Sequence, residues 1–181
     1  MIKEFNIMAE LMLQKAEIAD LLDVMEITKQ AKALLKADGI NQWQAGYPNE
    51  DDFENDIVKG HLYVAKLEKT VVGFISLIDG IDPWYKIIEN GAWLRYDQPY
   101  YTIHRVAVSL SASGQQVGYR MLRAAILKCL ELDATIASIR VDTHPLNTRM
   151  QHLLEKVGFV KTGEIFINEG ELRFAYEYLK A

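Results

Sequence analysis

The stretch from Tyr101 to Leu132 holds the residues whose types and spacing are best suited to chemistry. It consists of a β-rich run, YYTIHRVAVS, a short loop of small and polar residues, SASGQQVG, and an amphipathic run, YRMLRAAILKCLEL. A strand that leads through a glycine-bearing loop into a helix directs unpaired backbone N–H groups and the positive end of the helix dipole toward one point. Because this arrangement suits a phosphate, the stretch predicts a site for a nucleotide-like cofactor.

The apolar alternation in the β-rich run slips by one residue at His104-Arg105. Tyr101 and Ile103, before the slip, have odd numbers, and Val106 and Val108, after it, have even numbers. A β-bulge leaves such a slip, and it would release backbone N–H and C=O groups to an extended ligand beside the loop. A strand that is buried on both faces also lacks regular alternation, so the pattern leaves both interpretations open.

The loop itself carries two glycines, Gly114 and Gly118, which allow close backbone approach and unusual torsion angles. A plain strand-to-helix turn with glycine at the helix start would have the same composition. The loop matches neither the Walker A pattern nor GxGxxG. The kind of ligand therefore has to be inferred from the rest of the chain.

A second motif runs from Asn147 to Phe159 and reads NTRMQHLLEKVGF. Together with RVAVSLSASGQQVGYRML, it resembles the GNAT superfamily of acyl-CoA-dependent N-acyltransferases. The pyrophosphate loop of that family typically reads R/Q-x-x-G-x-G/A, and its later helix typically reads N-x-x-A-x-x-L-Y-E-K-x-G-F. The resemblance covers most of the chain and is strongest from Ile103 to Phe159.

The resemblance implies an N-acetyltransferase that moves an acetyl group from acetyl-CoA, its cosubstrate, to an amine of a small molecule or peptide by direct attack. In that family the bulged strand pairs with the pantetheine arm, the loop amides bind the pyrophosphate, and the asparagine of the later motif lies near the thioester. The cofactor-binding residues that this implies are Val106, Ala107, Val108, Ser113, Gly114, Gln115, Gln116, Val117, Gly118, Tyr119 and Asn147.

Three positions depart from the family pattern. Ser113 replaces the usual Arg or Gln, and Gln116 replaces the first small residue, whereas Gly118 matches the second. Leu154 stands where the family commonly has a tyrosine that protonates the departing thiolate, and a leucine has no proton to donate. These departures motivate an alternative function, a CoA-binding or interaction domain of the same fold with weak or no catalysis.

Direct attack on a thioester requires a neutral amine, an oxyanion donor and a route for the amine proton. The backbone N–H near Val106 is the candidate oxyanion donor. His104 and His144 are the candidate catalytic residues, since an imidazole titrates near neutral pH, and Asp142 stands close to His144. A histidine packed into the sheet is the alternative for His104. The four histidines show no metal-ligand spacing, so no metal is expected.

Aromatic residues are candidates for binding the acceptor. They lie in a linker after the first predicted helix and in a long segment without clear periodicity, and they are Trp43, Tyr47, Trp84 and Trp93. Aromatic walls favour an apolar or cationic acceptor through packing and cation–π contact. The alternative is a satellite core under the loop or a contact in a homodimer.

The remaining patterns predict the elements that would position these residues. Before the stretch Tyr101 to Leu132, apolar spacing and turn signals predict a strand at Glu10 to Gln14, a helix from Ile18 to Lys36, a helix from Asp51 to Lys59, a hairpin of His61 to Leu67 and Thr70 to Ile78, and the long segment Asp79 to Pro99. After that stretch they predict a strand at Ser138 to Thr143, a helix ending at Gly158, and a final hairpin. This order predicts an α/β fold with a mixed, mostly antiparallel central sheet and flanking helices, GNAT-like, in a single domain over residues 1–181.

Composition limits the partners. The chain has 181 residues, half of them apolar, and a formal net charge of −5, which gives no general attraction to nucleic acid or to an anionic membrane surface. We see no membrane-length apolar run and no signal-peptide pattern, so we expect a cytoplasmic location. Cys129, the single cysteine, excludes an internal disulfide and is expected to be a buried hydrophobe. A homodimer is compatible with the sequence.

Overall fold

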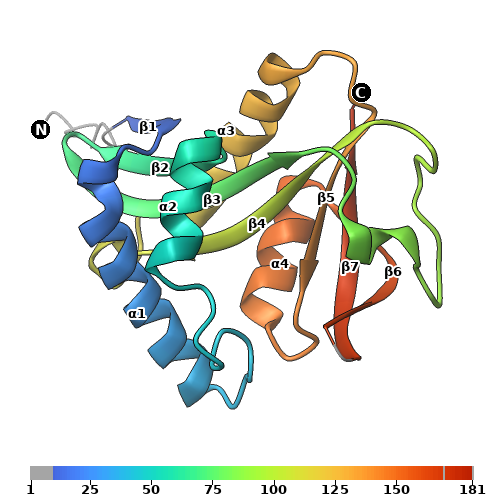
Figure 1. Ribbon diagram of the computed structural model, residues 1–181, viewed down its shortest axis with the longest axis horizontal. Helices are drawn as coiled ribbons and strands as arrows, with labels where there is room; N and C mark the ends of the chain where they lie inside the picture. Colours follow the sequence, from blue (N-terminus) through green and yellow to red (C-terminus); the bar gives the residue numbers. More distant parts are fainter. Residues whose placement is uncertain (1–9, 169, 181) are drawn as a thin grey trace, which may run out of the picture.

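The computed structural model describes residues 10–168 and 170–180, and it contains one seven-stranded sheet with helices on both faces (Figure 1). The strands lie in the order β1-β2-β3-β4-β5-β7-β6, and all neighbours are antiparallel except β4 and β5, which are parallel. The strands are β1 Leu11–Lys15, β2 Leu62–Leu67, β3 Thr70–Asp79, β4 Tyr100–Val108, β5 Ser138–Thr143, β6 Val160–Ile167 and β7 Glu171–Leu179. The helices are α1 Leu21–Ala37, α2 Glu50–Lys59, α3 Val117–Leu132 and α4 Thr148–Val157, and the short 3-10 turns are η1 Ile18–Asp20, η2 Pro83–Lys86 and η3 Leu110–Ala112. The predicted fold class is confirmed.

Each face of the sheet is covered by its own pair of helices, because successive residues of a strand point to opposite faces. On one face, Val24 of α1 and Phe53 of α2 share a buried cluster with Phe74 of β3. On the other face, Met121 of α3 shares a buried cluster with Ile75, the next residue of β3. In Figure 1, α1 and α2 lie in front of the sheet, and α3 lies behind it.

The parallel pair β4 and β5 separates after a few residues. Their pairing runs from Tyr100 opposite Ser138 to Ile103 opposite Val141, although β4 continues to Val108. Figure 1 shows β4 turning away from β5, with α4 close to the opening between them. The carboxyl ends of two parallel strands therefore diverge at the place where α/β proteins commonly bind ligands.

A β-bulge interrupts β4 at the predicted slip. Ser76 of β3 lies opposite His104 and Phe74 lies opposite Ala107, so Arg105 and Val106 together face one residue of β3. Arg105 has a φ of 50°, in the left-handed region that residues other than glycine seldom adopt. The structure confirms the bulge, and it does so in a strand whose residues are buried to unequal degrees.

The long segment Asp79 to Pro99 is held by backbone hydrogen bonds to β6, which the sequence pattern did not predict. After η2, Glu89 exchanges two backbone hydrogen bonds with Glu164 of β6, each 2.8 Å long, and the N–H of Ala92 donates to the carbonyl of Thr162 at 3.0 Å. The segment thus covers part of the outer edge of β6. Within the described ranges, no helix has the length and apolar character needed to cross a membrane.

Candidate functional site

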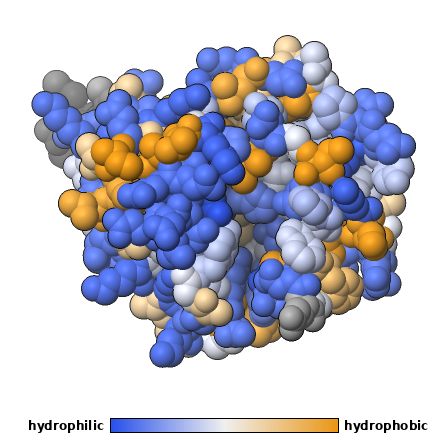
Figure 2. Space-filling model, viewed as in Figure 1, coloured by the Kyte–Doolittle hydropathy of each residue, from blue (hydrophilic) through white to orange (hydrophobic). Residues whose placement is uncertain are grey.

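A cavity of about 740 Å³ opens where β4 and β5 diverge. Its walls come from β4 and β5, from α1 and the linker that follows it, from η2, from the first turns of α4, and from the turn between β6 and β7. Elsewhere, on the face shown in Figure 2, apolar residues form small groups separated by hydrophilic ones. The cavity itself is lined by both apolar and polar side chains, as small-molecule sites usually are.

One wall of the cavity is the edge of β4 that β5 leaves free. Every residue from His104 to Val108 lines the cavity, which includes the predicted Val106, Ala107 and Val108. Because the pairing with β5 ends at Ile103, this edge presents backbone groups to the cavity instead of to another strand. An extended chain with amide groups, such as pantetheine, matches such an edge.

The loop between β4 and α3 presents its residues to solvent near this edge. Ser113 to Gln116 are exposed, and Gly114 and Gln116 have φ values of 79° and 55°. Gln116 therefore has a left-handed backbone conformation, which residues other than glycine seldom adopt. The first hydrogen bond of α3 joins the N–H of Arg120 to the carbonyl of Gln116 at 3.0 Å, so the preceding N–H groups, from Val117 to Tyr119, are the free donors of a helix start.

Gly118 lies where α3 packs against α4. A Cβ atom at this position would come within 3.0 Å of Leu153 Cδ2 and 3.8 Å of Val108 Cγ2. Leu153 and Val108 both line the cavity. The glycine therefore lets the start of α3 approach the cavity walls more closely than another residue would.

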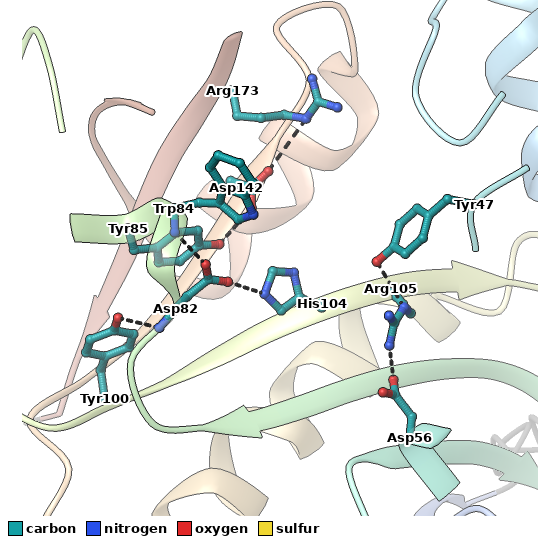
Figure 3. A network of polar contacts seen from close by, with 10 residues as sticks. All are labelled: Tyr47, Asp56, Asp82, Trp84, Tyr85, Tyr100, His104, Arg105, Asp142 and Arg173. Carbon is teal, nitrogen blue, oxygen red and sulfur yellow. Dashed lines mark hydrogen bonds and ion pairs between the residues drawn. The ribbon is translucent and has the colours of Figure 1, made fainter. Parts of the chain in front are cut away.

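His104 projects into the cavity from the bulge and is bound to Asp82 (Figure 3). The distance between His104 Nε2 and Asp82 Oδ2 is 2.9 Å. Burial raises the pKa of Asp82, but hydrogen bonds from His104 and from the backbone N–H of Trp84 outweigh it, so this pKa lies below its ordinary value. An ionised carboxylate only accepts hydrogen bonds, so Nε2 carries the proton and Nδ1 is the ring nitrogen that can accept one.

Asp82 is itself fixed by the start of η2. Its Oδ1 accepts the backbone N–H of Trp84 at 2.9 Å, and its own backbone N–H donates to the Tyr100 hydroxyl at 3.1 Å. The side chain of Asp82 is 14% exposed. The carboxylate thus has one oxygen for the backbone and the other for His104.

A second carboxylate, Asp142, lines the cavity at the end of β5. The hydroxyl of Tyr85 donates to its Oδ1 at 2.7 Å, and Arg173 Nε lies 3.7 Å from its Oδ2. Burial, and then the neighbouring Asp142, raise the pKa of Tyr85 well above its ordinary value. Tyr85 is therefore a protonated donor to Asp142 at neutral pH.

The family model for the acetyltransferase (GNAT) family matches residues 28–159. The chain belongs to this family. Members of the GNAT family are acyltransferases, and the seven-stranded sheet with its helices matches the fold of solved GNAT structures.

Two kinds of relatives accompany this match. The Uncharacterized N-acetyltransferase YesJ of Bacillus subtilis is 30% identical over 95 residues, which are 50% of each chain, so the match spans half the length of that relative. A GNAT-family acetyltransferase of Streptococcus agalactiae has a TM-score of 0.85 at 29% identity, over 94% of this chain and 96% of that one. The spermidine N-acetyltransferase of Vibrio cholerae, solved with CoA and spermine, has a TM-score of 0.64 at 16% identity, over 93% and 95% of the two chains.

Of the two histidines singled out in this GNAT chain, the cavity contains only His104. His144 lies in a neighbouring cavity of about 150 Å³ together with Glu171 and Arg173. Its Nδ1 accepts the backbone N–H of Leu146 at 3.1 Å, and burial, followed by the charge of Arg173, lowers its pKa. His144 therefore keeps a structural hydrogen bond at the end of β5, apart from His104.

Three of the four aromatic residues expected on the acceptor side, Trp43, Tyr47 and Trp84, line the cavity. Trp93 does not: it is 4% exposed, its ring stacks on Tyr85 at 5.2 Å between centroids, and its Nε1 donates to the Tyr85 carbonyl at 2.8 Å. The expectation of a substrate contact by Trp93 is wrong, because this ring belongs to the satellite core that supports Tyr85.

On α4, Asn147 lines the cavity and also caps the helix, since its Oδ1 accepts the N–H of Met150 at 3.2 Å. Leu154, at the position where the family commonly has a tyrosine, is fully buried in the core under α3, and Leu153 lines the cavity instead. Tyr119, at the start of α3, has Lys156 Nζ 5.1 Å from its ring centre.

Two charged residues of the site, Asp82 and Arg173, were not among the residues expected from the sequence. Asp82 carried one signal, since an aspartate directly before Pro83 is typical of a capped helical start. Nothing in the sequence indicated that this turn would lie beside His104, because the contact joins positions 22 residues apart on two different elements.

Proposed function

We propose that this protein transfers an acetyl group from acetyl-CoA to an amine of a small molecule or peptide in the cavity between β4 and β5. The observation that carries the proposal is that one cavity contains both the free edge of β4 and the His104–Asp82 pair. The first suits an extended cosubstrate, and the second suits the removal of a proton from an attacking amine.

The residues present fit CoA. We infer that Val106, Ala107 and Val108 pair with the pantetheine arm, that the loop from Ser113 to Gly118 and Tyr119 hold the pyrophosphate, and that Asn147 donates its amide near the thioester. The free N–H groups at the start of α3 and the positive φ of Gly114 support this assignment. When bound, acetyl-CoA supplies the activated acetyl thioester.

His104 is the proposed general base. Its Nδ1 accepts a proton from the acceptor amine, directly or through a water molecule, and the ionised Asp82 stabilises the resulting imidazolium through Nε2. The backbone N–H of Val106, beyond the bulge, is the proposed donor to the oxyanion that forms on the carbonyl.

The chain leaves protonation of the departing thiolate to solvent. Leu154 has no proton to give, and Tyr85 donates its proton to Asp142 and has a pKa well above its ordinary value. A thiol is acidic enough to leave without a dedicated acid. The absence of the tyrosine at Leu154 is also the observation that favours the second candidate, a CoA-binding domain without turnover.

The acceptor side favours a cationic or aromatic amine. Trp43, Tyr47 and Trp84 offer aromatic surfaces, and the carboxylates of Asp82 and Asp142 attract a positive charge. The Vibrio cholerae enzyme, which has the same fold and was solved with spermine, supports an amine acceptor.

The test measures acetyl-CoA-dependent release of free thiol with polyamines, amino acids, aminoglycosides and peptides, beside calorimetry of CoA binding. Turnover well above the acceptor-free rate with one amine class supports the transferase and excludes the second candidate. Binding of CoA without turnover on any acceptor supports the second candidate. If CoA neither binds nor raises the melting temperature, both functions are refuted.

A further inference from the structure

Arg105 combines an unusual backbone with a buried charged side chain. Its φ of 50° belongs to a conformation that costs energy for any residue other than glycine, and it occurs at the bulge between His104 and Val106. Its side chain is only 13% exposed. A strained backbone and a buried charge at one position require compensating contacts.

The contacts of Arg105 come from α2 and from the linker that carries Tyr47 (Figure 3). Arg105 Nη1 forms an ion pair with Asp56 Oδ2 on α2, and Arg105 Nε donates to the Tyr47 hydroxyl at 3.0 Å. Asp56 Oδ2 also accepts the Ser76 hydroxyl of β3 at 2.7 Å. We call these four residues, Arg105, Asp56, Ser76 and Tyr47, the bulge clasp.

The bulge clasp joins the two sides of the cavity. Ser76 lies directly opposite His104 in the sheet, so the clasp holds the proposed base from its neighbouring strand. Tyr47 belongs to the wall proposed for the acceptor, and its ring lies under the guanidinium at 5.2 Å. One cation therefore fixes both the position of the bulge and the position of an acceptor-side ring.

We propose that Arg105 is a positioning residue for the transfer reaction: it holds the bulge that directs His104 and the Val106 N–H into the cavity, and it anchors Tyr47 against the same bulge. The expected effects on kcat and KM rest on the proposed function. The expected effect on the rigidity of the bulge does not depend on that function.

A purely stabilising role is the competing explanation. Lys66 and Asp20 form a comparable ion pair, 2.7 Å long and 19% and 9% exposed, and neither residue lines the cavity. Lys66→Ala is therefore the matched control, since it removes a partly buried cation without touching the bulge or the acceptor wall.

Three variants separate the backbone role from the side-chain role. Arg105→Ala removes the guanidinium and leaves a side chain at the positive φ, whereas Arg105→Gly removes it and makes that φ accessible. Asp56→Asn keeps an oxygen for Ser76 and removes the charge nearest to Arg105, and it leaves Asp52 Oδ1 at 3.9 Å from Arg105 Nη2. Kinetics are measured with acetyl-CoA and the best amine of the panel, and melting temperatures report folding.

We expect Arg105→Ala to lower kcat about tenfold or more, because small displacements of reacting groups have large effects on rate. Arg105→Gly is expected to recover much of kcat but to share with Arg105→Ala a raised KM for the acceptor, since Tyr47 has lost its anchor in both. Asp56→Asn is expected to lower kcat by less than Arg105→Ala does. Equal kcat values for Arg105→Ala and Arg105→Gly, an unchanged acceptor KM in both, or an equal loss in Lys66→Ala would overturn the proposal.

Amide hydrogen exchange tests the clasp without any substrate. Exchange at residues 104–107 is expected to be at least about tenfold faster in Arg105→Ala than in the wild type and in Lys66→Ala, because the bulge opens locally. Unchanged exchange at these amides overturns the proposal. A wild-type protein that lacks turnover refutes the proposed function alone, and the exchange result then still decides whether Arg105 fixes the bulge.

Discussion

Replacement of Asp82 by asparagine isolates the charge that orients His104. The asparagine side chain would keep an oxygen for the Trp84 N–H and nearly the same volume, so the start of η2 is expected to persist. What the variant loses is the ionised acceptor 2.9 Å from His104 Nε2, in a pair whose side chains are 26% and 14% exposed. A hydrogen bond to a charged group contributes about 1.5 to 3 kcal/mol, which corresponds to roughly a 10- to 150-fold loss of kcat/KM.

The assay is the initial rate of thiol release at saturating acetyl-CoA, with kcat/KM determined for the best acceptor. Asp79→Asn is the matched control, because Asp79 pairs with His61 at 3.4 Å outside the cavity and is itself 69% exposed. In a His104→Gln background, Asp82→Asn is expected to have almost no further effect, since the two residues act as a unit. A loss smaller than about twofold in Asp82→Asn, or an equal loss in Asp79→Asn, refutes the assignment of the base.

The same carboxylate predicts a pH dependence of stability. Although burial raises the pKa of Asp82, hydrogen bonds from His104 and Trp84 lower it to below its ordinary value of 3.8. Its contribution to the free energy of unfolding is therefore complete above about pH 3.8 and is lost as the pH falls through the lowered folded-state pKa. Urea denaturation at fixed pH should show a difference in the free energy of unfolding between wild type and Asp82→Asn at pH 5, and this difference should shrink as the pH falls below about 3.8.

Other buried contacts in the protein lead to three more expected outcomes. Gly118→Val should weaken CoA binding several-fold in calorimetry, because its Cβ would meet Leu153 at 3.0 Å, and an unchanged Kd would contradict the placement of the pyrophosphate. Glu177→Gln should lower the free energy of unfolding by about 3 kcal/mol, since it leaves the Arg140 charge without its buried partner, and a loss under 1 kcal/mol in urea denaturation would contradict this. Cys129 should resist alkylation at pH 8 until the protein unfolds, because burial raises its pKa to about 12, and rapid labelling of the native protein would disprove that burial.

Local patterns predicted the elements well, including the bulge and the loop that leads into α3. The slip at His104-Arg105 corresponds to a real bulge, and the loop after it leads into α3 as expected, because both features depend on residues adjacent in sequence. The helix of the later motif ends at Gly158, as expected, and the structure adds that Asn147 caps its start. Such signals are encoded by neighbouring residues and survive without knowledge of the tertiary structure.

The acceptor side depended on contacts between distant segments. Asp82 contacts His104 because the tertiary fold places η2 beside β4. Arg105 forms an ion pair with Asp56 because α2 covers this face of the sheet. The sequence did not distinguish Trp93 from Trp84, yet Trp93 is buried against Tyr85 whereas Trp84 lines the cavity. Composition identifies such residues as large and aromatic, whereas only packing decides which of them contacts solvent.

The segment Asp79 to Pro99, which is hydrogen-bonded to β6, affects whether two protein molecules can associate through this sheet edge. A Cβ atom on Gly91 would lie 1.9 Å from the Thr162 carbonyl oxygen, and one on Gly163 would lie 2.8 Å from the Glu89 carbonyl oxygen. Because Gly91 and Gly163 have no side chains, the segment can pack on the edge of β6. An uncovered strand edge could pair with a strand of another chain. Gly91→Ala is expected to displace the segment and to promote concentration-dependent aggregation, which light scattering measures.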